Sequence, residues 1–261
     1  MQQNSKLERE NSMNETIKHQ LNHRTFRKYI ADKEVPQETV DLLIDVALQT
    51  ASHMHMQAWS IIRVTDPDLR QQFFKINKQP YIVEVSELWI FLVDCHRNFK
   101  IVEGMGYTGQ AANTMDRFMQ GYIDACMAAQ NVLNAVESLG MGGVYFGSIS
   151  RDYKKTCELL DLPQMTFPVV GLGFGYPAED WVVKPRLPRE FRVFENTYKD
   201  DFDGPEAIKA YDEAMSQYCD QRRPNQPEGP FTDMLLNLME NVYSEESSFL
   251  QHLKDQGFRT D

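Results

Sequence analysis

The spacing of apolar residues predicts several helices in this chain. Between residues 13 and 22, Ile17 and Leu21 stand four positions apart, as on one face of a helix. Pro36 precedes a second helix, expected over residues 37–50, whose apolar residues recur at the helical period: Val40, Leu43, Ile44, Ala47 and Leu48. Three further helical patterns follow later in the chain, at residues 152–160, 205–218 and 231–253.

The longest apolar pattern runs from Met115 to Leu139 and predicts a helix. Its apolar residues cover most of the helix circumference: Ile123, Cys126, Met127, Ala128, Ala129, Val132, Leu133, Ala135 and Val136. A helix of this kind is expected in the middle of a fold. Gly140 ends it, with Gly142 and Gly143 following, as is typical of a helix C-terminus.

Short apolar runs predict four strands, over residues 59–64, 88–93, 143–146 and 167–174. Because strands and helices alternate along the chain, we expect helices layered around a sheet. This regularity is lost after Pro177. There, Pro185 and Pro188 favour an extended arm, and the polar stretch 221–230 resembles a surface loop.

Composition narrows the class of protein. The chain has 261 residues, of which 42% are hydrophobic and 25% charged, which is enough apolar material for a sizeable core. Its net charge of -11 argues against non-specific binding to nucleic acid or to an anionic membrane. Four scattered cysteines show no zinc spacing, and no signal-peptide segment or membrane-length apolar run occurs, so we expect a cytoplasmic protein. Residues 1–12 are polar and are expected to be disordered.

Two groups of basic residues stand out against the acidic composition. One is the run His-Arg-Thr-Phe-Arg-Lys at residues 23–28, and the other is Lys184 with Arg186, roughly 160 residues later. Pro185 and Pro188 stiffen the second segment, so its two cations can grip a single anionic group. The pair of clusters predicts a specific anion site, although Lys184 and Arg186 alone could equally lie on a solvated loop.

Two other motifs allow more than one interpretation. The run His-Met-His-Met at residues 53–56 has side chains that suit copper, but no partner residues stand at a defined spacing elsewhere, so we expect no metal site. The glycines at 171, 173 and 175 could be mistaken for a dinucleotide fingerprint. That fingerprint requires a helix directly after its last glycine, and Tyr176-Pro177 prevents one.

The order of motifs along the chain carries a resemblance. The motifs are HRTFR at 23–27, QAWSIIRV at 57–64, AAQN at 128–131, ESLGMGG at 137–143, PVVGLGFGYP at 168–177, KPRLP at 184–188 and ENTY at 195–198. Together they resemble the flavin-dependent nitroreductase family, closest to its NADPH-preferring class of oxygen-insensitive nitroreductases and flavin reductases. The resemblance covers the chain from about His19 onward.

This resemblance implies an α+β fold with three α/β/α layers and a central mixed sheet flanked by helices. It implies a single FMN-binding domain over residues 13–261, in which residues 178–261 form a C-terminal arm and a helical excursion. In the family, such an arm wraps onto a second subunit. We therefore expect an obligate homodimer in which the arm is exchanged.

The resemblance also implies bound FMN, with NADPH as electron donor and NADH as a second donor. Residues expected around the ribityl phosphate are His23, Arg24, Thr25, Arg27, Lys184 and Arg186. Residues expected beside the flavin ring are Ser52, His53, Met54, Gln57, Gln79, Tyr145, Phe146, Gly147 and Ser148. Arg222 and Arg223 are candidates for binding the 2′-phosphate of NADPH, and since the cations there are few, we expect only a modest preference for it.

The sequence departs from the family in two loops near the expected flavin. In the family, the first loop is Ser-rich and comes from the other subunit, whereas here only Ser52 remains of that run. In the second, the family has Arg-Asn where Ser150-Arg151 stands. The contacts of the first loop are therefore not given by the resemblance.

The resulting functional hypothesis is an oxidoreductase in which the flavin carries the chemistry and no protein residue is catalytic. Hydride would pass from NAD(P)H to a nitroaromatic, a quinone or free flavin in a ping-pong cycle, which agrees with the lack of a Ser-His-Asp or paired-carboxylate motif. The alternative is an FMN-binding redox sensor or flavin-storage protein with little turnover. A structural protein without a cofactor is the third hypothesis.

Overall fold

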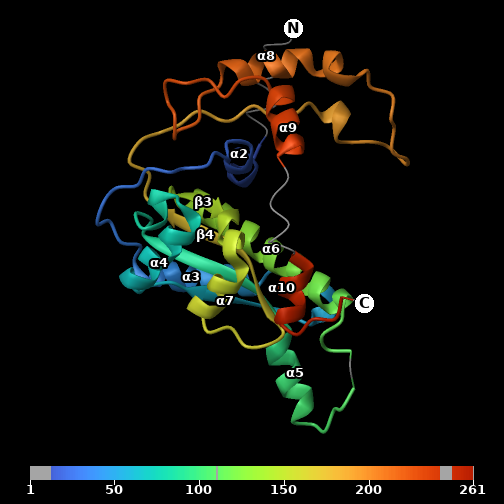
Figure 1. Cartoon of the computed structure of the whole chain (residues 1–261). Coiled ribbons are helices and arrows are strands. Elements are labelled where there is room, and N and C mark those ends of the chain that lie inside the picture. The colour runs from blue at the N-terminus through green and yellow to red at the C-terminus, as the bar shows by residue number, and fades with distance from the viewer. Residues whose placement is uncertain (1–12, 110, 242–248, 261) are drawn as a thin grey trace. The chain divides into compact units, whose positions relative to one another are not determined.

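The structure is a computed structural model that describes residues 13–109, 111–241 and 249–260. The chain divides into two compact units (Figure 1). Unit 1 comprises Met1–Asp180 and Glu245–Asp261, and unit 2 comprises Trp181–Ser244. The division falls close to residue 178, where the arm was expected to begin, whereas the expectation of one domain over 13–261 stays a prediction.

A four-stranded sheet forms the centre of unit 1. Its strands are β1 (Trp59–Arg63), β2 (Glu87–Asp94), β3 (Gly142–Phe146) and β4 (Thr166–Gly175), in the order β1-β2-β4-β3. All four strands were predicted from the sequence. Each pairing between them is antiparallel, so the parallel pair that a mixed sheet contains is not found among the described strands.

One face of the sheet is covered by α6 (Met115–Ser138), and α3 (Gln37–Leu48) packs on α6. The helix buries the apolar side chains Phe118, Ala125, Ala128, Val132, Leu133 and Val136 in a core shared with the sheet. Gly121 is needed for this approach, because a Cβ there would lie 2.5 Å from the Ala58 carbonyl oxygen. α6 lies between the sheet and α3, in the middle of the unit as expected, while Ile123 and Cys126 on its outer face are exposed in the single chain.

The opposite face of the sheet is covered by shorter elements. η3 (Gly147–Asp152) packs on β4, and α4 (Pro67–Asn77) packs on η3 and on η2 (Pro80–Ile82). A Cβ built on Gly171 of β4 would touch Phe146 and Ile149 on this side, together with Ile90 of β2. Because both faces are covered, β2 is buried along almost its whole length. The three-layer α/β/α arrangement predicted for the chain is thus present in unit 1.

The remaining helices of unit 1 are α2 (Glu15–Leu21), η1 (His53–His55), α5 (Cys95–Glu103), α7 (Tyr153–Leu159) and α10 (Phe249–Asp255). α5 extends away from the sheet (Figure 1). α10 returns to the core, where the ring of Phe249 packs at 5.5 Å from Phe167 and Phe258 packs at 5.0 Å from Phe118. The last described residues thus belong to the core of unit 1, and the exchange of the C-terminal arm stays a prediction.

Unit 2 contains η4 (Arg189–Phe191), η5 (Gly204–Ile208), α8 (Lys209–Gln217) and α9 (Phe231–Glu240). α8 and α9 pair through the rings of Tyr211 and Phe231, 5.3 Å apart, and through a bond of 2.7 Å from the Thr232 hydroxyl to Asp212. The single helix predicted over 231–253 was wrong, because α9 ends at Glu240 and α10 lies in the other unit. The sequence patterns also failed to predict α4 and α5.

Residues 1–12, expected to be disordered, lie outside the described residues. In the described part of the chain, no helix is both long and apolar enough to cross a membrane.

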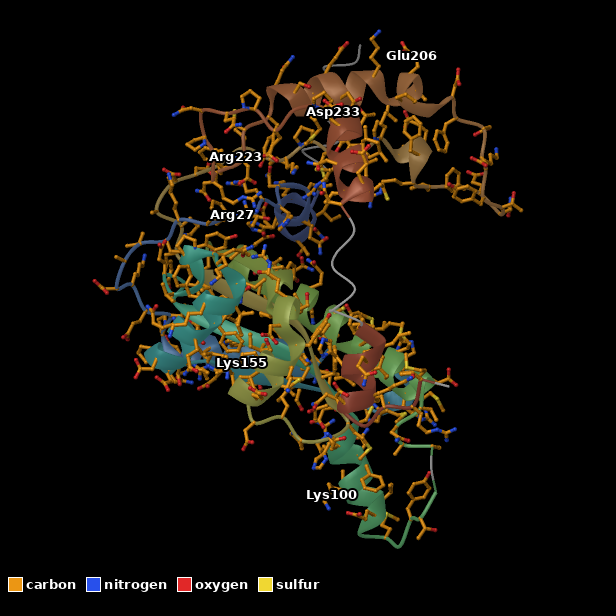
Figure 2. The ribbon with its side chains drawn as sticks, in the orientation of Figure 1. Arg27, Lys100, Lys155, Glu206, Arg223 and Asp233 are labelled. Carbon is orange, nitrogen blue, oxygen red and sulfur yellow. The ribbon has the colours of Figure 1, made fainter. Side chains whose placement is uncertain are left out.

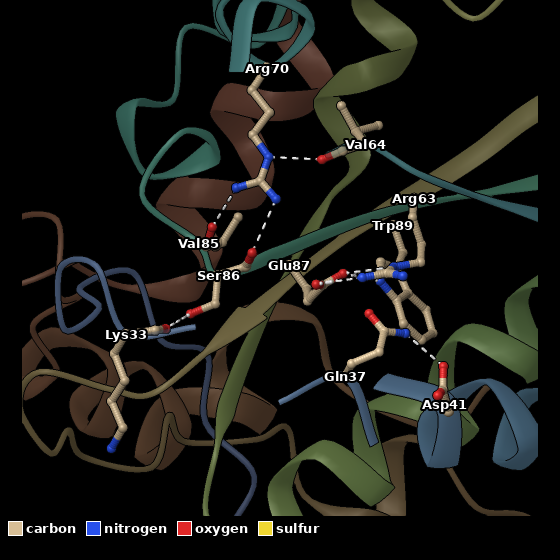
Figure 3. Close-up of polar contacts among 10 residues, drawn as sticks. All are labelled: Lys33, Gln37, Asp41, Arg63, Val64, Arg70, Val85, Ser86, Glu87 and Trp89. Atoms are coloured by element: carbon tan, nitrogen blue, oxygen red, sulfur yellow. Dashed lines mark hydrogen bonds and ion pairs between the residues drawn. The ribbon is translucent and has the colours of Figure 1, made fainter. Parts of the chain in front are cut away.

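A polar cluster joins β1 to β2 at the edge of the sheet (Figure 3). The buried Glu87 accepts two bonds from the Arg63 guanidinium, at 2.9 and 3.1 Å, and one from the Trp89 indole N–H at 2.7 Å. Nearby, Arg70 donates to three main-chain carbonyls, those of Val64, Val85 and Ser86. The cluster satisfies charged groups that the sheet edge partly buries.

Replacing Glu87 by Gln should destabilise unit 1. The amide keeps the shape of the side chain, but the Arg63 guanidinium loses its counter-charge in a site where Glu87 is only 8% exposed. We expect the free energy of unfolding to fall by about 1–3 kcal/mol, measured by urea unfolding followed through tryptophan fluorescence. The control is Glu103→Gln, which removes the exposed pair with Lys100 and should cost under about 1 kcal/mol. Equal losses in the two variants would contradict this role of Glu87.

Candidate functional site

The basic segment that follows α2 is held in place by Phe26. The Phe26 N–H donates to the Gly143 carbonyl at 3.1 Å, and its buried ring lies against Gly142 of β3. A Cβ at position 142 would overlap the Phe26 ring, so the absence of a side chain there makes room for it. The segment containing His23, Arg24 and Arg27 is therefore fixed at the start of β3.

His23 and Arg24 each pair with a carboxylate of unit 1. The His23 Nδ1 lies 2.6 Å from Oε1 of Glu137, a side chain of α6 that is only 10% exposed. The Arg24 guanidinium donates to Asp180 Oδ1 at 2.5 and 2.9 Å and lies 5.3 Å from the centre of the Phe26 ring. Arg24 and Glu137 line a cavity of 490 Å³, to which Asp180 also contributes.

Arg27 connects the basic segment to other predicted residues through Tyr81 of η2. The guanidinium lies over the Tyr81 ring at 6.0 Å, and that ring stacks on Phe146 at 5.4 Å. Arg27 is labelled in Figure 2, in the part of the chain that follows α2. Gln79 comes directly before η2, and its buried Oε1 has no hydrogen-bond partner among the described residues. Three predicted residues from distant parts of the sequence thus gather around Tyr81.

Asn77 ties the segment after β3 to the same place. It is fully buried at the end of α4, where its side-chain oxygen accepts a hydrogen bond from the Ser148 hydroxyl. Its main-chain carbonyl accepts a bond from Arg151 at 3.0 Å. Since Asn77 and Gln79 belong to one short stretch of chain, the predicted residues Gln79 and Ser148 are positioned together.

Tyr145 and Gly147 lie on either side of the end of β3. The Tyr145 hydroxyl donates to Gln130 of α6 at 3.4 Å, and burial raises the pKa of this phenol well above its ordinary value, so it stays neutral. A Cβ built on Gly147 would meet no atom within 4 Å. The main chain at Gly147 therefore faces open space, as the approach of a flat ligand requires.

The predicted residues Ser52, His53, Met54 and Gln57 form a second group, held by helices α5 and α6. His53 is bonded to Asp124 of α6 through both its main-chain N–H and its ring. The carbonyl groups of residues 56 and 57 accept bonds from side chains of α5. Among the described residues, no group of three His, Cys, Asp or Glu side chains could hold a metal.

The remaining predicted cations belong to unit 2. Lys184 Nζ lies 5.4 Å from the centre of the Tyr218 ring. Burial raises the pKa of Tyr211, and the nearby Arg186 opposes that rise. Whether Lys184 and Arg186 reach the same anion as His23 and Arg24 stays a prediction.

The two candidate residues for the 2′-phosphate of NADPH are both bonded to carboxylates in unit 2. Arg222 donates from Nε to Asp220 at 2.7 Å, and Arg223, labelled in Figure 2, pairs with Glu228 at 3.0 Å. Both carboxylates are largely buried. These arginines are therefore partly neutralised, and the modest preference for NADPH stays a prediction.

The rejection of a dinucleotide-binding loop is confirmed. Gly171, Gly173 and Gly175 all lie inside strand β4, and no helix follows them directly. Their missing side chains make room for neighbours, since a Cβ at Gly173 would overlap Phe146 and one at Gly175 would lie 2.5 Å from the Ser86 hydroxyl. These glycines serve the packing of the sheet.

Several residues that build the site were not found from the sequence. They are the residues that hold the predicted ones in place: Asn77, Tyr81, Asp124, Glu137 and Asp180. Two of them had a signal, because Asp124 and Glu137 are carboxylates in a helix whose apolar residues cover most of the circumference. A carboxylate on a buried helix face needs a partner, and that requirement could have marked both.

Comparison with known proteins identifies the family of the chain. Residues 21–176 match the Nitroreductase family, and residues 184–261 match the C-terminal domain of that family. The chain is 33% identical over 251 residues to the FMN reductase (NADPH) of Bacillus subtilis, with 94% of this chain and 99% of that protein covered. It is also 33% identical over 250 residues to the oxygen-insensitive NADPH nitroreductase of Salmonella typhimurium, covering 95% and 100%.

A solved structure shares the fold over the same length. It is the NADPH:FMN oxidoreductase from Vibrio harveyi complexed with NAD⁺, which superposes with a TM-score of 0.84 at 28% identity and covers 95% of this chain and 100% of that one. The resemblance drawn from the motifs is therefore confirmed over both units. This chain belongs to the nitroreductase family.

Proposed function

We propose that this protein is an NADPH-dependent oxidoreductase that binds FMN and reduces flat acceptors such as nitroaromatics, quinones or free flavin. Membership of the nitroreductase family and the activities in the names of its relatives support the oxidoreductase class. The Bacillus and Salmonella relatives, which match almost end to end, are named for NADPH, and the Vibrio structure holds NAD⁺. NADPH as the main donor, with NADH as a second one, agrees with these names.

One observation carries the cofactor assignment. Around Tyr81, the fold assembles a cation (Arg27), an amide whose buried oxygen lacks a hydrogen-bond partner in the described part of the chain (Gln79), and an open stretch of main chain at Gly147. A buried acceptor without a partner costs about 1–3 kcal/mol, so it fits a site that a donor group of a ligand completes. A flavin has a ring N–H donor at one end and a phosphate at the other.

The roles of the side chains follow from this arrangement. His23, Arg24, Thr25 and Arg27 would bind the ribityl phosphate, and Gln79 with the main chain at residues 145–148 would bind the ring edge. When bound, FMN supplies a two-electron centre that accepts and donates hydride. The protein supplies position, because an oxidant and NADPH that use one exposed ring face in turn give a ping-pong cycle.

Unit 2 would contribute the donor specificity. Lys184 and Arg186 are proposed to complete the phosphate site, and Arg222 and Arg223 are proposed to meet the 2′-phosphate of NADPH. Their carboxylate partners Asp220 and Glu228 compete with that phosphate. A phosphate that meets a paired arginine gains less than one that meets a free cation, which supports a modest preference for NADPH over NADH.

We also propose that the active form is a homodimer. The buried face of α6 packs on the sheet, but its outer face carries the apolar stripe Met119, Ile123 and Cys126, and the first two are 46% and 39% exposed. β1 adds an unpaired strand edge, since it lies at one end of the strand order. An exposed apolar stripe and an open strand edge are both typical of surfaces that a second subunit covers.

The rival function is an FMN-binding redox sensor or storage protein with little turnover. The unusual loop 52–57 motivates it, because residues that differ from the family there could block the donor. The same loop is firmly bonded to α5 and α6, which favours a formed site over a degenerate one.

The function can be tested by the colour of the purified protein. We expect the purified protein to be yellow from bound flavin. Under anaerobic conditions NADPH should abolish the flavin colour, and a quinone added afterwards should restore it. A yellow protein that stays oxidised under NADPH would support the sensor or storage function. Colourless protein that takes up no added FMN would refute both.

The proposed phosphate site can be tested by disturbing the packing of Phe26 on Gly142, which fixes the basic segment. Gly142→Ala should push the Phe26 ring away and displace the basic segment, which weakens the charged hydrogen bonds to phosphate. We expect the dissociation constant of FMN, measured by flavin fluorescence, to rise about tenfold or more. The control is Gly104→Ala at the end of α5, where the new Cβ makes only ordinary contacts at 3.5 Å. If both variants keep their FMN equally well, the segment does not bind it.

The homodimer can be tested by light scattering. Wild-type protein at micromolar concentration should scatter as twice the 30.3 kDa chain mass. Ile123→Lys should dissociate it, because a charge in an apolar interface lacks a partner. A wild-type monomer that retains FMN would rule out a shared site.

A further inference from the structure

We propose that Asp124 of α6 is a positioning residue of the flavin site, which holds the His53 ring and the loop 52–57 in their working geometry. This inference rests on the proposed function, because it assigns a role within the same FMN site. Asp124 matches no motif quoted for the family resemblance. Its role follows from three independent properties of the loop and of the carboxylate.

The loop adopts a conformation that its own residues disfavour. Met54, His55 and Gln57 have φ angles of 50°, 58° and 49°, in the left-handed region that residues other than glycine rarely adopt. Each such residue costs on the order of 1–3 kcal/mol and persists only where the surroundings impose it. Because three such residues occur within four positions, the conformation of the loop must be imposed by contacts with other parts of the fold.

The outside contacts come from two helices. Asn98 of α5 donates to the Met56 carbonyl at 2.8 Å, and Arg97 of α5 donates to the Gln57 carbonyl. Asp124 of α6 accepts from the His53 main-chain N–H at 3.0 Å and lies 2.8 Å from the His53 Nδ1. The two ends of the strained segment are therefore fixed to different helices, and Asp124 holds the N-terminal end.

The buried carboxylate of Asp124 also needs the loop, because the loop supplies its hydrogen-bond donors. The residue is 0% exposed, and among the described residues all of its side-chain hydrogen bonds go to His53. A buried carboxylate without hydrogen bonds is costly, so this contact is retained whenever unit 1 is folded. A loop bonded in this way is placed before any ligand arrives, which reduces the entropy lost on binding.

The contact also defines what the His53 ring can offer. A carboxylate oxygen only accepts, so Nδ1 carries the hydrogen that meets Asp124, and Nε2 is the ring nitrogen left to face a ligand. The His53 side chain is 40% exposed, which leaves the ring accessible to a ligand. Asp124 thus sets both the orientation and the tautomer of a residue expected beside the flavin.

A second pair on the same helix has the same form. Glu137 of α6 holds the Nδ1 of His23 at 2.6 Å, and His23 is another residue expected at the FMN. The two carboxylates are 13 positions apart, so at 1.5 Å per residue they lie about 20 Å apart along α6. One rigid helix therefore positions one histidine of each group of predicted site residues.

The test compares Asp124→Ala with Asp124→Asn as holoproteins. Alanine removes the acceptor for both N–H groups, whereas asparagine keeps one oxygen that can accept both. We expect the dissociation constant of FMN to rise at least tenfold for alanine and less for asparagine, measured from flavin released on dilution. We also expect the visible spectrum of the bound flavin to shift in Asp124→Asn. The His53 ring, which is expected beside the flavin, then contacts a neutral amide in place of a carboxylate. A merely structural residue would leave that spectrum unchanged.

A double-mutant cycle with His53→Ala tests whether Asp124 acts through His53. If it does, the double variant loses FMN affinity no further than Asp124→Ala alone, so the two effects are not additive. Fully additive losses would overturn the proposal. Ser138→Ala on α6, which removes only a bond to the helix main chain, is the matched control and should behave as wild type.

The outcomes separate this proposal from the proposed function. Wild-type protein that binds no FMN would refute the function itself. Wild-type protein that binds FMN, together with Asp124 variants of unchanged affinity and spectrum, would refute only the role of Asp124. If Asp124→Ala does not fold, Asp124→Asn and His53→Ala decide by the same two measurements.

Discussion

Unit 1 depends on the burial of one face of α6 against the sheet. Seven apolar side chains from Phe118 to Val136 are buried there together with strand β2. Each large apolar side chain buried in this way contributes about 1.5–3 kcal/mol, and Gly121 lets the helix approach closely. A helix fixed so firmly is a rigid support, and Asp124 and Glu137 use it to orient side chains from two loops.

Much of the architecture could be predicted because its elements follow their periodicity closely. All four strands and the long helix α6 lie within a few residues of the expected ranges. The prediction failed for α4 and α5, whose sequences PDLRQQFFKIN and CHRNFKIVE are short and mostly polar, so their apolar faces are narrow. It also failed for the single helix over 231–253, because the apolar residues of that pattern belong to two separate helices in different units.

The sequence predicted which residues belong to the candidate site, but not the contacts that hold them in place. The family resemblance identified His23, Gln79 and His53. The residues that hold them include partners far apart in the chain, such as Glu137 for His23. The strained loop could not be predicted either, because left-handed conformations are assigned from glycines and this loop has none. Such conformations follow from tertiary bonds, which a single sequence does not display.

The ion pair between Arg24 and Asp180 has a consequence for the energetics of anion binding. In the folded chain, the guanidinium already holds a carboxylate as its internal counter-ion, on a side chain that is 80% exposed. A phosphate arriving at Arg24 therefore exchanges one anion for another and does not neutralise a bare charge. Because an exposed pair is worth at most about 1 kcal/mol, the exchange is easy. Arg24 thus has a counter-ion even when no ligand is bound.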